Sequence, residues 1–202
     1  MHLQLPSATE IFAFITGAIC VWLLVKENIW SWPIGIANNL FYVVVFWWAK
    51  LYADMGLQFF YIAISIYGWW NWLHHPPNTK KLRVIRVGVQ EGTILLFTGI
   101  GATAALYWLL HRFTDSTVPL GDGLTTAMSL VAQYMLSRKH IENWYVWIAA
   151  DIIYIGLYTY KQFYLTSLLY LIFMIMCIMG VVQWRKSLQS EPTPDGVEVG
   201  SL

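Results

Sequence analysis

The sequence predicts an all-α integral membrane protein with seven transmembrane helices, arranged as two parallel three-helix repeats joined by a connecting helix. Three observations support this fold class. Of the 202 residues, 58% are hydrophobic and only 11% are charged, whereas a soluble domain has roughly 25% charged residues. Seven stretches are long and apolar enough to span a bilayer. The first three and the last three of them are related by an internal repeat.

The spans follow one another with mostly short connections. A transmembrane helix needs about 20 mainly apolar residues. In chain order, the qualifying stretches are residues 9–25, 31–48, 54–73, 91–110, 120–137, 141–160 and 163–184. Pro76 and Pro77 end the third helix, and the basic loop that follows stays in water. We therefore divide the chain into a first repeat (1–73), a basic loop with the connecting helix (74–119), a second repeat (120–186) and a polar, disordered tail (187–202).

Basic residues predict the orientation, because cytoplasmic loops retain positive charge. On one side of the predicted membrane lie Lys26, Lys80, Lys81, Arg83, Arg86, Arg138, Lys139, Arg185 and Lys186. On the other side lie only Lys50, Arg112 and Lys161. The N-terminus is therefore expected outside and the C-terminus in the cytoplasm. We interpret the basic residues as topology signals, with no nucleic acid or lipid headgroup needed to explain them.

An internal repeat emerges when the chain is shifted by 112 positions. Residues 32–72 then lie on residues 144–184 without a gap, and nine of the 41 positions are identical. The pairs include Trp32 with Trp144 and Trp72 with Trp184. Three spans and one connecting span separate equivalent helices, so both repeats begin on the outer side and run parallel. In transporters with such repeats, the substrate site lies between them near the bilayer midplane.

The sixth span carries an aspartate near its middle, Asp151, which aligns with Asn39 of the first repeat. A carboxylate exposed to lipid there costs several kcal/mol, so Asp151 is expected to face the bundle interior or a wet cavity. Two interpretations stay open. Asp151 is either a hydrogen-bond anchor between helices, to Asn38, Asn39 or Gln133, or a group that lines the substrate path and offsets a cation.

Aromatic and polar side chains near the midplane complete the candidate site. On a helix, one stripe contains Trp144, Trp147, Asp151, Tyr154 and Tyr158. Aromatic faces attract cations, and amides and hydroxyls from other spans suit a small, flat molecule with polar edges. The predicted substrate-binding residues are Asn39, Gln58, Tyr61, Gln133, Trp144, Trp147, Asp151, Tyr154 and Tyr170.

The remaining tryptophans, cysteines and histidines predict no further site. Tryptophans near span ends are expected in the interfacial belts, namely Trp30, Trp32, Trp69, Trp70, Trp72 and Trp184. Cys20 and Cys177 lie in separate apolar runs, which predicts neither a disulfide nor a metal site. The sequence has no paired catalytic carboxylates and no H-E-x-x-H motif. We therefore expect no enzyme activity and no cofactor.

Three segments in order, YADMGLQFFYIAISIYGWWNW, SLVAQYMLSRKHIENWYVW and YKQFYLTSLLYLIF, resemble the PnuC family of bacterial vitamin transporters. The resemblance extends from the first span to the seventh. It implies a SWEET-like 3+1+3 fold, usually as a homotrimer, in the bacterial inner membrane. It also implies facilitated diffusion of nicotinamide riboside, thiamine or riboflavin, with a cytoplasmic kinase that traps the vitamin by phosphorylation.

The resemblance to the nicotinamide riboside branch is partial. It implies a glutamine at Gln58 and tryptophans at Trp144 and Trp147, as here, but asparagines at the positions of Asp151 and Met179. Because an aspartate suits a cation with an amino-substituted ring, the sequence slightly favours thiamine. Nicotinamide riboside, also a cation, is the alternative, and riboflavin follows. Asp151 is the one carboxylate near mid-membrane, so no ion-coupling relay is expected.

Overall fold

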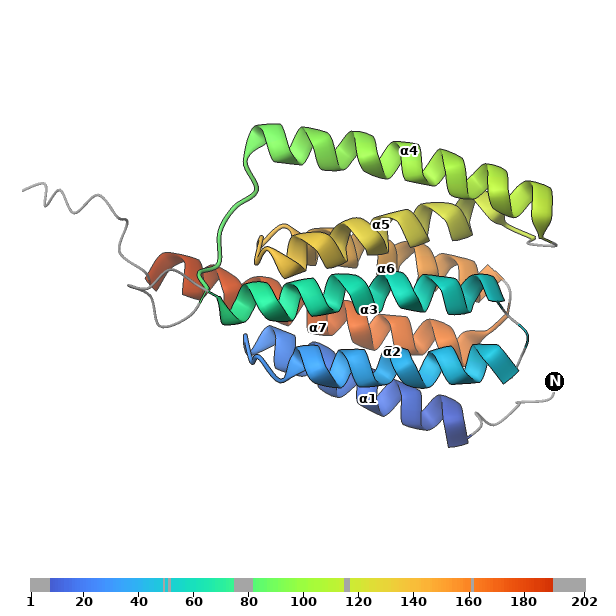
Figure 1. Ribbon diagram of the computed structural model, residues 1–202, viewed down its shortest axis with the longest axis horizontal. Coiled ribbons are helices and arrows are strands. Elements are labelled where there is room, and N and C mark those ends of the chain that lie inside the picture. The colour runs from blue at the N-terminus through green and yellow to red at the C-terminus, as the bar shows by residue number, and fades with distance from the viewer. Residues whose placement is uncertain are drawn as a thin grey trace, which may run out of the picture.

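The computed structural model describes residues 8–48, 50, 52–74, 82–114, 117–160 and 162–190, and these residues form seven α-helices (Figure 1). They are α1 (Ala8–Val25), α2 (Ser31–Trp48), α3 (Tyr52–Leu73), α4 (Val89–Phe113), α5 (Pro119–Ser137), α6 (Asn143–Tyr160) and α7 (Tyr164–Ser190). Each helix corresponds to one predicted span. The all-helical prediction is confirmed for the described residues, and only the end of α7 departs from its predicted boundary by more than three residues.

The last helix is longer than the sequence predicts. α7 continues to Ser190 and so includes residues 187–190, which the sequence analysis assigned to the tail. These residues are polar, but Ser187 donates a hydrogen bond to the carboxylate of Glu27, which fixes the end of the helix against the α1–α2 loop. The rest of the predicted tail lies outside the described residues, as do Pro76, Pro77 and the lysines that follow them.

Six of the helices form a closed ring, and α4 lies outside it. Around the ring, α1 contacts α2, α2 contacts α3, and α3 contacts α5. The ring continues from α5 to α6 and from α6 to α7, and it closes where α7 contacts α1. The fourth helix packs against α5 alone and has no buried residue, so it lies along one edge of the molecule (Figure 1). The two halves of the chain therefore meet at α3–α5 and at α1–α7.

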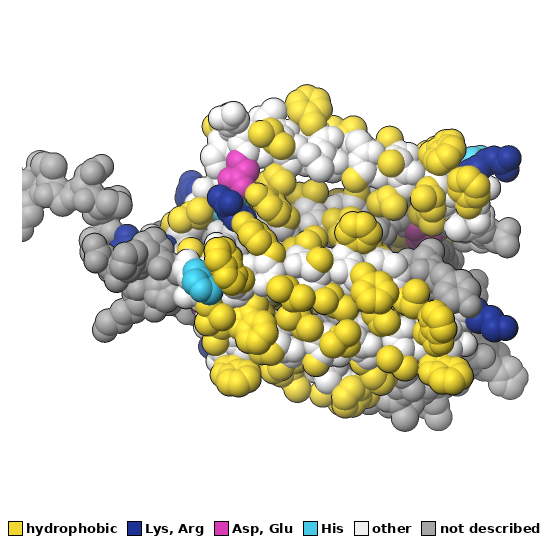
Figure 2. Space-filling view, in the orientation of Figure 1, with side chains coloured by type: hydrophobic (Ala, Val, Ile, Leu, Met, Phe, Trp, Pro, Cys, Tyr) yellow, Lys and Arg dark blue, Asp and Glu magenta, His cyan; other side chains and the backbone are white. Residues whose placement is uncertain are grey.

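The outer surface of the molecule is apolar. Hydrophobic side chains cover the middle of the visible face, whereas charged side chains gather near its two ends (Figure 2). By length and hydropathy alone, α4 and α7 qualify as membrane-spanning helices within the described part of the chain. An apolar band between charged ends is the surface expected of helices surrounded by lipid.

The backbone repeats itself at the 112-residue shift. Among the described residues, four that are not glycine have positive φ: Glu27 (54°), Lys50 (59°), Lys139 (61°) and Gln162 (62°). Lys139 is the equivalent of Glu27, and Gln162 is the equivalent of Lys50. Left-handed backbone is unfavourable for residues with a Cβ. Its recurrence at equivalent positions shows that both halves turn between their helices in the same way.

Two glycines make equivalent close contacts. A Cβ added to Gly68 on α3 would lie 2.3 Å from the indole of Trp32, and one added to Gly180 on α7 would lie 2.5 Å from the indole of Trp144. No side chain fits at either distance. In both halves, the third helix therefore approaches the second closely enough for a tryptophan to lie against its backbone.

Four indoles fill the end of the ring at which α2 and α6 begin. Trp32 and Trp72 lie edge to face with ring centroids 5.4 Å apart, as do Trp144 and Trp184 at 5.3 Å. Trp72 and Trp184 meet across the two halves at 6.1 Å. We call these four residues the tryptophan cluster. The cluster belongs to a group of buried hydrophobic residues that also includes Val25, Leu136 and Ile141.

The tryptophan cluster corrects part of the predicted aromatic belt. Trp32, Trp72 and Trp184 are only 2%, 6% and 0% exposed, so their assignment to the membrane interface was wrong. They fill the space where the six helices converge. Trp30, Trp69 and Trp70 are exposed, as belt residues should be.

The turn between α5 and α6 buries a histidine next to the tryptophan cluster. His140 is 1% exposed, and its Nε2 lies 3.7 Å from a carboxylate oxygen of Glu91. Burial lowers the pKa of His140 below its ordinary value of 6.5 and outweighs the opposing effect of Glu91. The imidazole is therefore neutral at neutral pH.

Acid should destabilise the protein through His140. Below about pH 6.5 the unfolded chain takes up a proton that the folded chain does not, so stability is lost as pH falls toward the lowered pKa. The loss is at most about 1.4 kcal/mol per pH unit. Thermal unfolding in detergent from pH 7.5 to 5 should show a smaller acid shift for His140→Gln than for wild type. His111→Gln, at an exposed position, is the control. An acid shift for His140→Gln equal to that of wild type would refute the assignment.

Candidate functional site

Aromatic rings from α6 and α7 form a stack. Tyr170 lies against Tyr154 with ring centroids 4.4 Å apart and against Tyr158 at 5.3 Å, with interplanar angles of 22° and 11°. Tyr154 and Tyr158 are four residues apart and so lie on the same face of α6. Tyr170 reaches them from the neighbouring helix.

Hydroxyl groups from α3 and α5 border this stack. Tyr154 lies within hydrogen-bonding reach of Thr125 and Ser129. Ser129 is also within reach of Tyr61 on α3. The site therefore draws on both halves of the chain, with α3 from one and α5, α6 and α7 from the other. Ring faces next to hydroxyls can stack on a flat ligand and hydrogen-bond to its edge.

Asp151 is buried beside this stack. It is 5% exposed, and Cys177 Sγ donates a weak hydrogen bond to its Oδ2 at 3.7 Å. Asp151 is close enough to interact electrostatically with Tyr154 and Tyr170. The prediction that the carboxylate faces the bundle interior is confirmed. Cys177 was not among the predicted partners of Asp151. The repeat aligns Cys177 with Ser65, which lies at the equivalent position of α3.

Two predicted amide partners of Asp151 make other hydrogen bonds. Asn38 Nδ2 donates to Thr16 Oγ1 at 2.7 Å and joins α2 to α1. Gln133 Nε2 donates to Ser65 Oγ at 3.4 Å and joins α5 to α3. Gln133 therefore lies one helical turn from Ser129, on the interface between the two halves.

Two of the other predicted site residues, Trp144 and Trp147, lie at the tryptophan cluster. Trp144 is 2% exposed and belongs to the tryptophan cluster, where Gly180 lies against its ring. Trp147 is partly buried and packs beside the same cluster. Asn39 and Gln58 are partly exposed on α2 and α3. The structure thus brings together Tyr61, Asp151, Tyr154 and Tyr170, with Gln133 nearby. It adds Thr125, which lies one turn before Ser129.

A separate groove lies outside the helix ring. It encloses about 810 Å³ between α4 and α5, and its walls include Ile94, Leu95, Leu130 and Tyr134. None of the predicted substrate-binding residues lines it. Within the described residues, no three His, Cys, Asp or Glu side chains are placed to hold a metal ion. The polar groups inside the ring are therefore the candidate site.

A ring of apolar helices around buried aromatic and polar side chains is typical of an integral membrane protein with a polar interior. The chain matches the family described as "Nicotinamide mononucleotide transporter" over residues 7–186, and it belongs to that family. The resemblance to PnuC proteins is thereby confirmed. The protein is a membrane transporter, and its relatives are transporters, not enzymes.

Several relatives align with most of the chain. Nicotinamide riboside transporter PnuC of Escherichia coli (strain K12) is 25% identical, covering 88% of this chain and 85% of that protein. Nicotinamide riboside transporter PnuC of Neisseria mucosa is 26% identical, covering 86% of this chain and 70% of that protein. Riboflavin/roseoflavin transporter RibM of Streptomyces davaonensis is 23% identical, covering 90% of this chain and 87% of that protein. The crystal structure of the vitamin B3 transporter PnuC superposes with a TM-score of 0.67 at 24% identity, covering 89% of this chain and 81% of that one. This similarity shows that the fold is shared.

Proposed function

We propose that this protein carries nicotinamide riboside across the bacterial inner membrane by facilitated diffusion. The observation that carries the proposal is the alignment of the chain, over most of its length, with relatives named as nicotinamide riboside transporters. The sequence slightly favoured thiamine, but the named relatives reported above take nicotinamide riboside or riboflavin. Nicotinamide riboside, the alternative in the sequence analysis, therefore replaces thiamine as the preferred substrate.

The chemistry of the candidate site suits this vitamin. Nicotinamide riboside has a flat pyridinium ring with a positive charge, a carboxamide and a ribose. The ring would stack on Tyr154 or Tyr170, and Asp151 would offset its charge. Gln133, Gln58 and the hydroxyls beside Tyr61 are the proposed partners of the carboxamide and ribose. Asn39, Trp144 and Trp147 complete the proposed site from their positions on α2 and α6.

Thiamine is the second candidate, and one observation favours it. Asp151 stands where the nicotinamide riboside branch is expected to have asparagine, and it is buried beside a thiol with no basic partner near it among the described contacts. Its two oxygens could accept hydrogen bonds from an amino-substituted ring as well as offset a cation. Asp151 therefore indicates a cationic substrate, but it does not separate nicotinamide riboside from thiamine.

We further propose that α1–α3 and α5–α7 are parallel repeats joined by α4, in a SWEET-like 3+1+3 arrangement. The paired left-handed residues and the paired Trp–Gly contacts support this assignment. We propose a homotrimer, as the family resemblance implies, and the apolar, unburied surface of α4 is compatible with it. A cytoplasmic kinase would then trap the vitamin by phosphorylation.

Calorimetric titration of the purified protein tests the substrate directly. Nicotinamide riboside, thiamine and riboflavin are titrated in parallel into the same preparation. Nicotinamide riboside should bind most tightly. Tighter binding of thiamine would reverse the order of the two candidates, and binding of riboflavin alone would exclude the cationic site.

Transport should equilibrate the vitamin without concentrating it. Asp151 is the one carboxylate among the described residues near the middle of a span, so the site has no second acidic group to relay a proton. Proteoliposomes loaded with buffer should take up labelled nicotinamide riboside until the inner and outer concentrations match. Accumulation above that level, driven by an imposed proton or sodium gradient, would contradict uniport.

The orientation can be tested with two exposed positions at opposite ends of the bundle. Lys186 lies on α7 at the end expected in the cytoplasm, and Tyr160 lies at the end of α6 expected outside. In a background without native cysteines, Tyr160→Cys should react with an impermeant maleimide added to intact cells. Lys186→Cys should react only after the inner membrane is opened. The reverse pattern would invert the proposed topology.

A further inference from the structure

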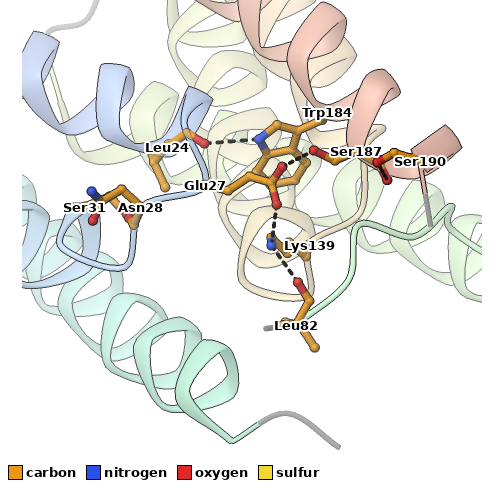
Figure 3. A network of polar contacts seen from close by, with 9 residues as sticks. All are labelled: Leu24, Glu27, Asn28, Ser31, Leu82, Lys139, Trp184, Ser187 and Ser190. Carbon is orange, nitrogen blue, oxygen red and sulfur yellow. Dashed lines mark hydrogen bonds and ion pairs between the residues drawn. The ribbon is translucent and has the colours of Figure 1, made fainter. Parts of the chain in front are cut away.

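A buried ion pair closes the end of the ring that holds the tryptophan cluster. Lys139 Nζ lies 2.7 Å from Glu27 Oε2, and the two side chains are only 2% and 5% exposed. Lys139 also donates a hydrogen bond to the backbone carbonyl of Leu82 at 2.6 Å, and Ser187 donates to the other carboxylate oxygen of Glu27 (Figure 3). Four segments that are far apart in the sequence therefore meet at one pair of charges.

The pair connects equivalent points of the two halves. Glu27 lies between α1 and α2, and Lys139 occupies the matching position between α5 and α6, 112 residues later. Both have left-handed backbone, and their side chains meet in the ion pair. A second bond crosses nearby, from Trp184 Nε1 to the carbonyl of Leu24 at 3.1 Å (Figure 3). No contact in this group is confined to one half.

The chemistry of the pair suits a contact that opens and closes. A buried ion pair contributes little net stability, because desolvation of both charges offsets their attraction. When the pair separates, water hydrates each charge and recovers much of that cost. Removal of one partner has a different effect, because the other charge is then left uncompensated in the closed state.

We propose that Glu27 and Lys139 form the cytoplasmic latch of the transporter, which separates each time the substrate is released. The inference rests on the proposed function, since a uniporter must open its site to each side in turn. In this structure the cytoplasmic end is closed. Cys177, which contacts Asp151, is 5% exposed and lies among the buried residues around the tryptophan cluster. Opening the latch and the indoles beneath it would expose Cys177 to the cytoplasm.

The reactivity of Cys177 provides the test. Cys20→Ala leaves Cys177 as the one cysteine of the chain, and an impermeant maleimide is added to inside-out vesicles that contain the full-length protein. Glu27→Gln and Lys139→Met should each raise the rate of Cys177 labelling tenfold or more, because the remaining charge favours the open state. Right-side-out vesicles should show no such increase.

Two matched variants control for loss of charge at this surface. Lys26→Met removes the neighbouring lysine, which is exposed and lies over the ring of Trp22. Glu142→Gln changes a carboxylate that accepts a hydrogen bond from the backbone of Val87. Neither residue pairs with Glu27 or Lys139 in the contacts above, so both variants should label Cys177 at the wild-type rate. Equal increases in the controls would mean that the surface has loosened generally, and the latch would be rejected.

The double variant Glu27→Met/Lys139→Met covers the case in which single variants fail to fold. It leaves no unpaired charge and places two flexible apolar side chains in the same space. Its Cys177 should be labelled more slowly than in wild type, and transport should slow while thermal stability is kept. Wild-type labelling and transport rates in the double variant would overturn the latch, as would unchanged labelling in folded single variants.

The labelling assay needs no vitamin, so it separates the latch from the proposed substrate. Increased Cys177 reactivity together with failure to bind nicotinamide riboside would support the latch and reject the substrate. Normal binding and transport of nicotinamide riboside with unchanged Cys177 reactivity would support the substrate and reject the latch. An increase seen only in right-side-out vesicles would reject a cytoplasmic latch and invert the orientation.

Discussion

Asp151→Asn is expected to weaken binding of a cationic vitamin by about 1–3 kcal/mol, the contribution of a hydrogen bond or contact with a charged group. The amide keeps the shape of the side chain and one acceptor oxygen but removes the negative charge. Cys177, the hydrogen-bond donor to Asp151, can still donate to that oxygen, so folding and membrane insertion should be preserved. Calorimetric titration of wild type and variant with nicotinamide riboside and thiamine measures the change.

The matched control is Glu91→Gln, which removes a carboxylate from α4, outside the ring of six helices. Its vitamin affinity should equal that of wild type. If well-folded Asp151→Asn protein also binds with unchanged affinity, the aspartate is a packing anchor between α6 and α7 and not part of the substrate site. If the variant gains preference for nicotinamide riboside over thiamine, Asp151 is an element of specificity.

Gly180→Ala should destabilise the protein by about 1–3 kcal/mol, the usual cost of overpacking a well-filled core. The new methyl would lie 2.5 Å from Cε2 of Trp144, which has no room to move because its ring is buried against Trp184. Gly68→Ala should behave in the same way against Trp32, because the contact is equivalent. Thermal unfolding of the purified protein in detergent measures both effects.

Gly156→Ala is the control for these two glycines. Gly156 lies in α6, and apart from its chain neighbours and the adjacent backbone of its own helix no atom lies within 4 Å of the place where its Cβ would be. Because alanine favours a helix over glycine, this variant should be as stable as wild type or more so. An equally large loss of stability at Gly156 would mean that helix flexibility, and not the Trp–Gly contact, accounts for the effect at Gly180.

The helices were predictable because the membrane makes strong demands on sequence. Each span must be apolar for about 20 residues and must satisfy its own backbone hydrogen bonds, which fixes where a helix is found within a few residues. The repeat was also readable, because Trp32, Gly68 and Trp72 recur at Trp144, Gly180 and Trp184. The structure explains this recurrence, since each tryptophan–glycine pair fixes a close approach of two helices.

The assignment of individual side chains was less predictable, because helical periodicity shows which residues share a face but not what the face contacts. Trp144 and Tyr154 belong to the same stripe on α6, yet one lies in the tryptophan cluster and the other in the tyrosine stack. The partner of Asp151 on α7 depends on the register between two helices. No pattern within either helix encodes that register.

Charge gave the least information about local contacts. Lys139 was interpreted as a topology signal because it follows Arg138 between two spans. The structure buries it at 1% exposure and pairs it with Glu27. The positive-inside rule concerns how a chain enters the membrane, and it does not say where a lysine lies once the helices have packed. Alignment of Glu27 with Lys139 in the repeat was the available signal, because it places opposite charges at equivalent positions.

The pairing of Glu27 with Lys139 is one that two identical halves could not make. In a symmetric dimer of identical chains, a residue close to the two-fold axis meets its own copy. Two identical three-helix units would therefore bring glutamate to glutamate, or lysine to lysine, at the position that Glu27 and Lys139 now share. Like charges repel at this distance, so the attraction exists only because the two halves are encoded separately. One chain that specifies the two positions separately can hold a glutamate at one and a lysine at the other, and this difference between the halves makes the contact attractive.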